Sequence, residues 1–194
     1  MNLQDYQKQW DKKPTLRAIY RDFYQKIENA MCDGDILEIG GGIGNLQIDS
    51  GCVIKSDIQY SPELDVVADA QNLPFDNEVF SNIVLFDVLH HLQCPLLFFS
   101  EARRVLKPGG KIIMLEPGIT PVSKIMYKVG HEEPVEMGWD MKDPCKVDVN
   151  KDPYDSNQAI PTILFKRDSK VFIEMVKGFN IDRSDWLSLF AYPL

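Results

Sequence analysis

Three glycines at alternate positions, Gly40, Gly42 and Gly44, are the stretch of the sequence best suited to hold a ligand. Glycine has no Cβ, so it lets the backbone turn tightly at a strand end and lets a ligand approach closely. Glu38 precedes the first glycine by two residues, and Asp57 ends the next apolar run. A carboxylate at a strand end can accept hydrogen bonds from both hydroxyls of a ribose. The pattern therefore indicates a site for a nucleoside cofactor.

Short apolar runs that end at these residues predict the strands of a parallel sheet. We expect strands at residues 35–39, 52–57, 65–69, 80–87, 111–116 and 181–190. Apolar residues at helical spacing predict helices over residues 1–30, 92–106 and 170–177, with a tight turn at 107–110. Strands that alternate with helices imply right-handed crossovers, so we expect an α/β fold with a doubly wound, mostly parallel sheet flanked by helices. Ligands bind at the carboxyl ends of the strands in such sheets.

Composition and charge exclude several classes of function. The 194 residues suit one domain with a full core. The net charge of −8 argues against sequence-independent binding to nucleic acid or an anionic membrane, because both need a basic surface. No apolar run is long enough to span a bilayer, and residues 1–10 lack the apolar core of a signal peptide. We therefore expect a cytoplasmic protein that is not inserted in a membrane.

The four cysteines, Cys32, Cys52, Cys94 and Cys145, lie far apart in the sequence and form no Cys-x-x-Cys pair. This spacing suggests neither a zinc site nor a disulfide framework, so we expect free thiols in a reducing compartment. The run His131-Glu132-Glu133 could serve acid–base chemistry, but it lacks the His-Glu-x-x-His spacing of a zinc enzyme. The sequence therefore predicts no metal.

Several stretches, in this order, resemble the motifs of the class I, seven-stranded S-adenosylmethionine-dependent methyltransferases. They are residues 37–44, Asp57, and residues 68–75, 86–92 and 103–110. The resemblance covers about residues 35–117 and implies a Rossmann-like fold that binds S-adenosyl-L-methionine. It also implies one methyltransferase domain over residues 1–194, whose parts we expect to be an N-terminal helical cap (1–30), a cofactor-binding core (35–117), a substrate-side insertion (118–165) and a C-terminal helix and strand (166–194).

The resemblance assigns the glycine turn and the second strand end to the methionine and ribose parts of the cofactor. The turn residues that would pass beneath the methionine part are Gly40, Gly41, Gly42 and Gly44. Glu38 would fix that turn and reach toward the cofactor's amino group. Asp57 would hold the ribose, and Ile58 would pack on the adenine face.

The later motifs are assigned to the adenine edge and to the methyl group. Asp69 would accept a hydrogen bond from the adenine amino group, with Ala70 beside it. Phe86 and Asp87, at the end of the fourth strand, would border the sulfonium and the methyl group to be transferred. The family resemblance thus implies that four strand ends converge on one cofactor.

His90 and His91 are the candidate catalytic bases. A sulfonium methyl group is already activated, so the protein must mainly align a nucleophile and exclude water. If that nucleophile is a hydroxyl, a nearby base assists, and histidine titrates near neutral pH. The alternative is that either histidine only packs or borders the cofactor.

The acceptor is predicted less directly, from the segment after the fifth strand. Glu116, Glu133, Trp139 and Tyr154 are among the side chains there that could face a pocket. Residues 155–161 resemble a segment of bacterial methyltransferases of envelope-glycan pathways, and asparagine and glutamine suit sugar hydroxyls. We therefore expect a small-molecule acceptor methylated on a hydroxyl oxygen, with a saccharide as one option.

Two other functions and one departure from the family stay open. A nicotinamide-dependent oxidoreductase shares the glycine turn and the ribose acid, and a non-catalytic binder of S-adenosylmethionine would keep the fold without turnover. The chain also has little length after residue 190 for the last strand of a seven-stranded sheet. An incomplete C-terminal strand pair would expose a sheet edge, which a homodimer could cover.

Overall fold

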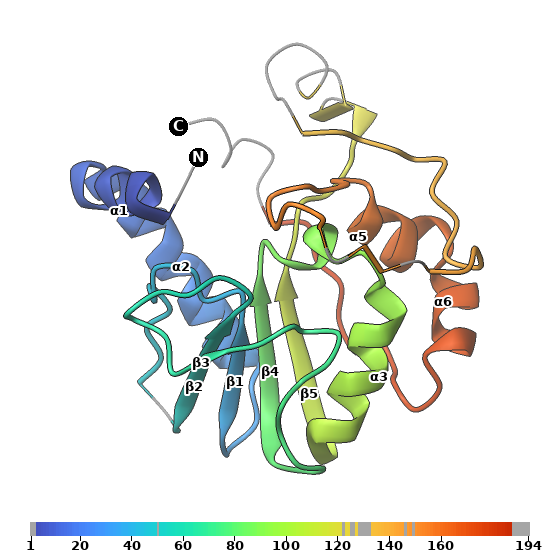
Figure 1. Ribbon diagram of the computed structural model, residues 1–194, viewed down its shortest axis with the longest axis horizontal. Helices are drawn as coiled ribbons and strands as arrows, with labels where there is room; N and C mark the ends of the chain where they lie inside the picture. Colours follow the sequence, from blue (N-terminus) through green and yellow to red (C-terminus); the bar gives the residue numbers. More distant parts are fainter. Residues whose placement is uncertain are drawn as a thin grey trace.

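The computed structural model describes residues 3–49, 51–121, 123–124, 127, 133–145, 147–148 and 150–187. In this part of the chain the central element is a five-stranded sheet, flanked by helices (Figure 1). Its strands are β1 (Ile36–Ile39), β2 (Val53–Asp57), β3 (Val66–Val67), β4 (Phe80–Phe86) and β5 (Leu106–Leu115). The expected strands from 35 to 116 are thus confirmed, although β3 is shorter and β5 longer than predicted.

The strand order is β3-β2-β1-β4-β5, and every neighbouring pair is parallel. All carboxyl ends therefore lie at one edge of the sheet. The order reverses between β1 and β4, because β2 and β3 lie on one side of β1 and β4 and β5 on the other. In doubly wound sheets this switch point is where ligands bind.

Helices cover the two faces of the sheet through alternate strand residues. The long helix α2 (Pro14–Ala30) packs on the face that holds Ile36 and Val84. The helix α3 (Pro95–Val105) packs on the opposite face, against Leu37 and Ile83. Successive side chains of a strand point to opposite faces, so the apolar strand runs fill two cores at once.

Further helical elements precede the sheet, follow β4, and follow the long segment after β5. Helix α1 (Leu3–Lys12) precedes α2, and Pro14 occupies the first turn of α2, where its missing N–H leaves no bond unmade. The turn η1 (Leu89–His91) follows β4. The C-terminal elements are α5 (Ile160–Thr162), the π-helical turn η2 (Ile163–Arg167) and α6 (Ser169–Met175). The helices expected within 1–30 and at 170–177 are confirmed.

The expected tight turn at 107–110 is wrong. Residue Leu106 already pairs with Phe80, and the next β4 partner, Asn82, pairs with Lys111. The extra residues of β5 form a bulge in which Gly109 has a φ of +80°. A bulge lets one strand carry more residues than its partner. The Lys-Pro-Gly-Gly sequence alone does not distinguish such a bulge from a turn.

The described residues show how the strands are connected and where the sheet ends. No helix connects β1 to β2, β2 to β3, or β3 to β4 in that part of the chain, so only α3 acts as a crossover helix. Residues 181–187 have no strand structure, and residues 188–190 of the predicted last strand lie outside the described residues. Among the described residues the sheet therefore stops at β5.

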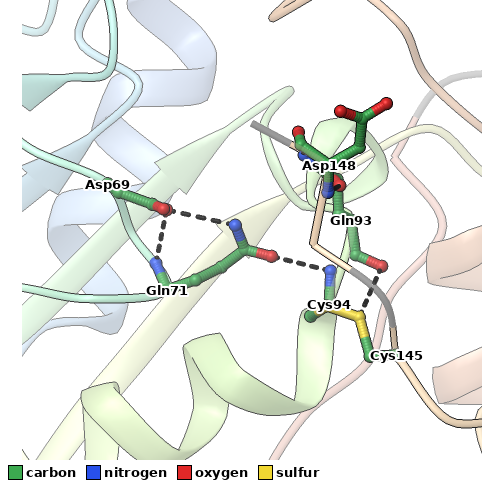
Figure 2. The surroundings of a disulfide bond; sticks show 6 residues. All are labelled: Asp69, Gln71, Gln93, Cys94, Cys145 and Asp148. Carbon is green, nitrogen blue, oxygen red and sulfur yellow. Dashed lines mark hydrogen bonds between the residues drawn. A yellow bond between two sulfur atoms is a disulfide. The ribbon is translucent and has the colours of Figure 1, made fainter. Parts of the chain in front are cut away.

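The prediction of four free cysteines is also wrong, because Cys94 and Cys145 form a disulfide with their Cα atoms 5.7 Å apart. Cys94 directly precedes α3, and Cys145 belongs to the long segment after β5 (Figure 2). The side chain of Gln93 also donates to the carbonyl of Asp148 and accepts from its N–H. The segment thus folds back onto the start of α3, a contact that cysteine spacing alone cannot reveal.

Removing the disulfide is expected to destabilise the protein. The bond joins residues 51 positions apart, and closing a loop of this size restricts the unfolded chain. We expect Cys145→Ser to lower the free energy of unfolding by about 2–4 kcal/mol in urea denaturation. Dithiothreitol should destabilise the wild type similarly and leave the variant unchanged. Cys52→Ser, which removes an exposed free thiol, is the control. If dithiothreitol left the urea denaturation curve of the wild type unchanged, the result would contradict the presence of the disulfide.

Candidate functional site

The glycine turn after β1 requires glycine for two separate reasons. Gly40, Gly42 and Gly44 have φ values of 73°, 53° and 72°, in the left-handed region that other residues rarely adopt. A Cβ on Gly40 would also lie 2.2 Å from a methyl group of Val88, in the turn after β4. The N–H of Gly44 donates to the carbonyl of Gly41 over 2.7 Å and closes the turn. The exits of β1 and β4 are therefore in contact.

Asp57, at the end of β2, is bound to this glycine turn. Its Oδ2 accepts the N–H of Gly42 over 2.9 Å, and its Oδ1 accepts the N–H of Gln59 over 2.9 Å. A carboxylate oxygen can accept a second hydrogen bond, so each oxygen keeps capacity for a hydroxyl donor. The structure thus brings together the glycine turn and the acid that the sequence places 15 residues later.

Glu38 is buried beside the same turn, with only 6% of its surface exposed. Its Oε2 is buried and has no hydrogen-bond partner in the described structure. Burial raises the pKa of Glu38 to about 7; Lys55 opposes this, and Asp57 and Asp65 add to it. An unsatisfied buried oxygen is costly, so this carboxyl group is suited to a donor or cation supplied by a ligand.

The residues assigned to the adenine lie beyond β2. Ile58 is 54% exposed, which leaves its side chain open to a ring. Asp69 uses Oδ1 to accept both the backbone and the side-chain N–H of Gln71, and Gln71 in turn accepts the N–H of Cys94 (Figure 2). Ala70 is buried. Asp69 is therefore held in place through Gln71 by the start of α3.

Phe86 lies on the α2 face of the sheet. Its ring stacks on Tyr20 with centroids 4.8 Å apart and also contacts Phe23 and Tyr24. Burial, and next the negative charge of Glu38, raise the pKa of Tyr24 well above its usual range. The sequence analysis did not single out Tyr24, because nothing local indicates that α2 reaches the end of β1.

Asp87, which follows Phe86, has a left-handed backbone with a φ of 56°. Its N–H donates to the carbonyl of Leu115 over 2.9 Å. Burial is the main cause that raises the pKa of Asp87 to about 7; Glu116 and Glu133 add to it, and His90 opposes it. A carboxyl group that titrates near neutral pH suits proton transfer.

The two histidines occupy different environments. His90 is buried, and its Nδ1 lies 2.8 Å from Oε2 of Glu116, which is buried as well. Burial lowers the pKa of His90, but the bond to Glu116 and the nearby carboxylates outweigh it, so the net direction is upward. His91 is half-buried near the carbonyl of Asp155, and burial followed by the charge of His90 lowers its pKa to about 4.

The segment after β5 adds further polar groups near Asp87. Burial raises the pKa of Tyr127 to about 12, with contributions from the charges of Asp87 and Glu133. The hydroxyl of Tyr127 donates to Oε1 of Gln158 over 3.4 Å, and the Gln158 amide donates to Glu133. Neither Tyr127 nor Gln158 could be paired with Asp87 from sequence, because 40 and 71 residues separate them from it.

The amide side chains of residues 157 and 158, which the sequence suggested for sugar hydroxyls, are hydrogen-bonded within the protein. Asn157 accepts the N–H groups of Glu136 and Ala159 and donates to the carbonyl of Glu136. Gln158 is bonded to Tyr127 and Glu133, as described above. Both residues fasten the segment internally. Among the other side chains expected there, Trp139 packs against the core, and His131 and Glu132 lie outside the described residues.

Metal-binding groups and membrane-spanning helices are both absent from the described residues. No group of three or more His, Cys, Asp or Glu side chains in this part of the chain is arranged to hold a metal ion. None of its helices is both long and apolar enough to cross a bilayer.

Comparisons with known proteins agree with the motifs at these strand ends. Residues 38–114 match a family model described as a methyltransferase domain. An uncharacterized protein from Methanocaldococcus jannaschii is 30% identical over 119 residues, which cover 57% of each chain. Demethylmenaquinone methyltransferase from Staphylococcus saprophyticus is 41% identical over 66 residues, which cover 33% of this chain and 28% of that enzyme. The chain thus spans about half or less of the length of these relatives.

Solved structures align with this chain at lower identity. A structure from Methanococcus maripaludis has a TM-score of 0.49 and 19% identity and covers 66% of this chain and 72% of its own. The PH0226 protein from Pyrococcus horikoshii has a TM-score of 0.46 and 26% identity, with coverage of 53% and 58%. The family match shows that residues 38–114 are similar to a methyltransferase domain.

S-adenosylmethionine is the methyl donor that this family implies, and the site chemistry fits it. The unpartnered Oε2 of Glu38 suits an ammonium group, and the left-handed glycines leave the backbone open to close approach. Asp57 keeps acceptor capacity for two hydroxyls. Of the cofactors left open by the sequence, the family match favours S-adenosylmethionine over a nicotinamide.

The raised pKa of Glu38 predicts a pH-dependent stability. Because its pKa is about 7 in the folded protein and 4.5 in the unfolded chain, the folded state binds more protons between these values. The free energy of unfolding therefore falls as the pH rises from about 4.5 to about 7, because the buried Glu38 must ionise. We expect Glu38→Gln to be more stable than the wild type at pH 8, by up to about 3 kcal/mol, with little difference at pH 4.5.

Urea denaturation at both pH values measures this effect. Glu174→Gln, at an exposed position of α6, is the control and should show no difference that grows with pH. If Glu38→Gln and the wild type had the same free energy of unfolding at pH 8, ionisation of Glu38 would not destabilise the folded protein and the prediction would be wrong.

Proposed function

We propose that this chain transfers the methyl group of S-adenosylmethionine to a small-molecule acceptor at the carboxyl ends of β1, β2 and β4. The observation that carries this proposal is the buried carboxyl of Glu38, unpartnered at Oε2, beside a glycine turn bound to Asp57. These groups lie at the switch point of the sheet, within the segment that matches the methyltransferase family.

In this proposal the cofactor lies across the exits of the strands. The backbone of Gly40, Gly41, Gly42 and Gly44 contacts its methionine part. Glu38 binds the ammonium group as a carboxylate, and Asp57 accepts from the ribose hydroxyls. Ile58 supports the adenine face, while Asp69 and Ala70 border the adenine edge. Phe86 and Asp87 lie on the side of the methyl group.

When bound, S-adenosylmethionine supplies a methyl group on a positively charged sulfur, already activated for transfer. The chain's own residues then have to align the acceptor and remove its proton. Asp87 is suited to accept a hydroxyl proton, because its pKa of about 7 is near the operating pH. His91, with a pKa of about 4, is too weak a base to hold that proton at neutral pH. In this proposal His90 contributes to the site through its ion pair with Glu116.

We propose a hydroxyl oxygen as the attacked atom, because Asp87 provides a base and the groups around it are polar. The side chains that act on Asp87 are Glu116, His90 and Glu133. A saccharide or envelope-glycan precursor is one acceptor of this chemistry. Its support is the likeness of residues 155–161 alone, since Asn157 and Gln158 are bonded internally. The relatives named demethylmenaquinone methyltransferase suggest a quinol as the second candidate. Related enzymes of ubiquinone and menaquinone biosynthesis are named C-methyltransferases, so for that acceptor the attacked atom would be carbon.

Three further expectations from the sequence remain proposals, and they concern cellular location, nucleic-acid binding and oligomeric state. A cytoplasmic location rested partly on free thiols, and the Cys94–Cys145 disulfide removes that support. The absence of nucleic-acid binding rests on the net charge of −8. A homodimer through the β5 edge rests on β5 having a single partner strand among the described residues.

Calorimetric titration tests the cofactor. We expect the wild type to bind S-adenosylhomocysteine, and Asp57→Ala to weaken that binding by about 1–3 kcal/mol through loss of charged hydrogen bonds. Asp33→Ala, at an exposed acid before the opposite end of β1, should bind as the wild type does. Binding of NAD in the absence of S-adenosylhomocysteine binding would overturn the proposal.

Formation of S-adenosylhomocysteine over an acceptor panel tests the reaction. The panel contains nucleotide sugars, free saccharides and a demethylmenaquinol analogue. We expect turnover with a hydroxylated acceptor, and a loss of 10²-fold or more in Asp87→Asn with little change in S-adenosylhomocysteine affinity. Cofactor binding without turnover on any acceptor would favour the non-catalytic binder instead.

A further inference from the structure

Glu116, the residue that follows β5, directs its whole carboxylate at the turn after β4. Its Oε1 accepts the N–H of Val88 over 2.9 Å and the N–H of Leu89 over 2.7 Å. Its Oε2 lies 2.8 Å from Nδ1 of His90. Three hydrogen bonds thus join one buried carboxylate to three consecutive residues of a neighbouring strand exit.

This turn is the one that presents Asp87. The left-handed backbone of Asp87 is unfavourable for a residue with a side chain, so the surrounding structure must hold it. The N–H of Asp87 is bound by Leu115, immediately before Glu116. On its other side the turn touches the glycine turn, where Val88 lies against Gly40. Glu116 therefore fixes the backbone that joins the proposed cofactor site to the proposed base.

The same carboxylate fixes the proton on His90. With Oε2 as an acceptor, Nδ1 must carry a hydrogen, which leaves Nε2 as the other ring atom that can exchange a proton. An acid that orients a histidine by this contact sets its tautomer and stabilises its protonated form. The titratable groups that face His90 from neighbouring elements are Glu116, Asp87, Glu133 and His91.

We propose that Glu116 is a positioning residue of the methyl-transfer site, which holds the turn that carries Asp87 and keeps the proton of His90 on Nδ1. The proposal rests on the methyltransferase function proposed above. Glu116 itself need not touch the acceptor or the cofactor, since its effect passes through Asp87 and His90.

Two variants separate the two effects of Glu116. Glu116→Gln keeps an oxygen that accepts the N–H groups of Val88 and Leu89, but it replaces the other oxygen with an NH2 group that donates to His90. Glu116→Ala removes both contacts. Glu136→Gln, at an exposed acid of the segment after β5, is the matched control.

Nuclear magnetic resonance of the cofactor-free protein provides a direct measurement. We expect hydrogen exchange at the Val88 and Leu89 amides to accelerate by at least tenfold in Glu116→Ala and to stay within about threefold of the wild type in Glu116→Gln. The pKa of His90, from its ring nitrogen shifts, should fall in both variants. Unchanged exchange in Glu116→Ala, or an unchanged His90 titration in Glu116→Gln, would overturn the proposal.

Kinetics with the acceptor that gives turnover adds the functional measurement. We expect Glu116→Gln to lower kcat by at least tenfold, with the KM for S-adenosylmethionine within about threefold of the wild type. Full kcat in Glu116→Gln would reduce Glu116 to a structural role and overturn the proposal. Failure of the wild type to bind S-adenosylhomocysteine would instead overturn the proposed function, and the resonance measurements would still report on the turn.

Discussion

The parallel pairing of β1 with β4 is the interaction on which the whole site depends. Residues Ile36 to Ile39 lie beside Asn82 to Leu85 without a break in register, so the two strands end together. Because they end together, the glycine turn and the turn after β4 meet at Gly40 and Val88. The pairing of β1 with β2 and of β4 with β5 then brings Asp57 and Glu116 to the same edge. These strand pairings thus determine the positions of four acidic side chains, Glu38, Asp57, Asp87 and Glu116.

Those four acids differ because their surroundings differ. Asp57 is supplied with backbone donors, whereas the Oε2 of Glu38 has none among the described residues. Burial raises the pKa of both Glu38 and Asp87 to about 7. Glu116, by contrast, accepts three hydrogen bonds and pairs with a histidine. Hydrogen bonding and burial therefore give these carboxylates different chemistry, which suits them to the different roles that we propose for them.

Local patterns in the sequence predicted the features whose causes are local. The apolar runs of β1, β2 and β4 and the glycines at 40, 42 and 44 follow from side-chain volume and backbone freedom within a few residues. The contacts that the sequence did not reveal join distant positions: Glu116 with His90, Cys94 with Cys145, and Tyr127 with Gln158. The bulge in β5 belongs with these, because its cause is the partner strand. Tertiary pairing decides such features, and the sequence near each residue carries little of that information.

The left-handed backbone at Asp87 also limits which acid can serve there. Aspartate and asparagine enter this conformation more readily than residues with longer side chains. A glutamate would meet the backbone at a higher cost and would place its carboxyl group one methylene further out. The carboxylate at this strand end therefore has a short arm with few rotamers. The main chain sets the position of this carboxylate, so in the proposed reaction the acceptor has to approach Asp87.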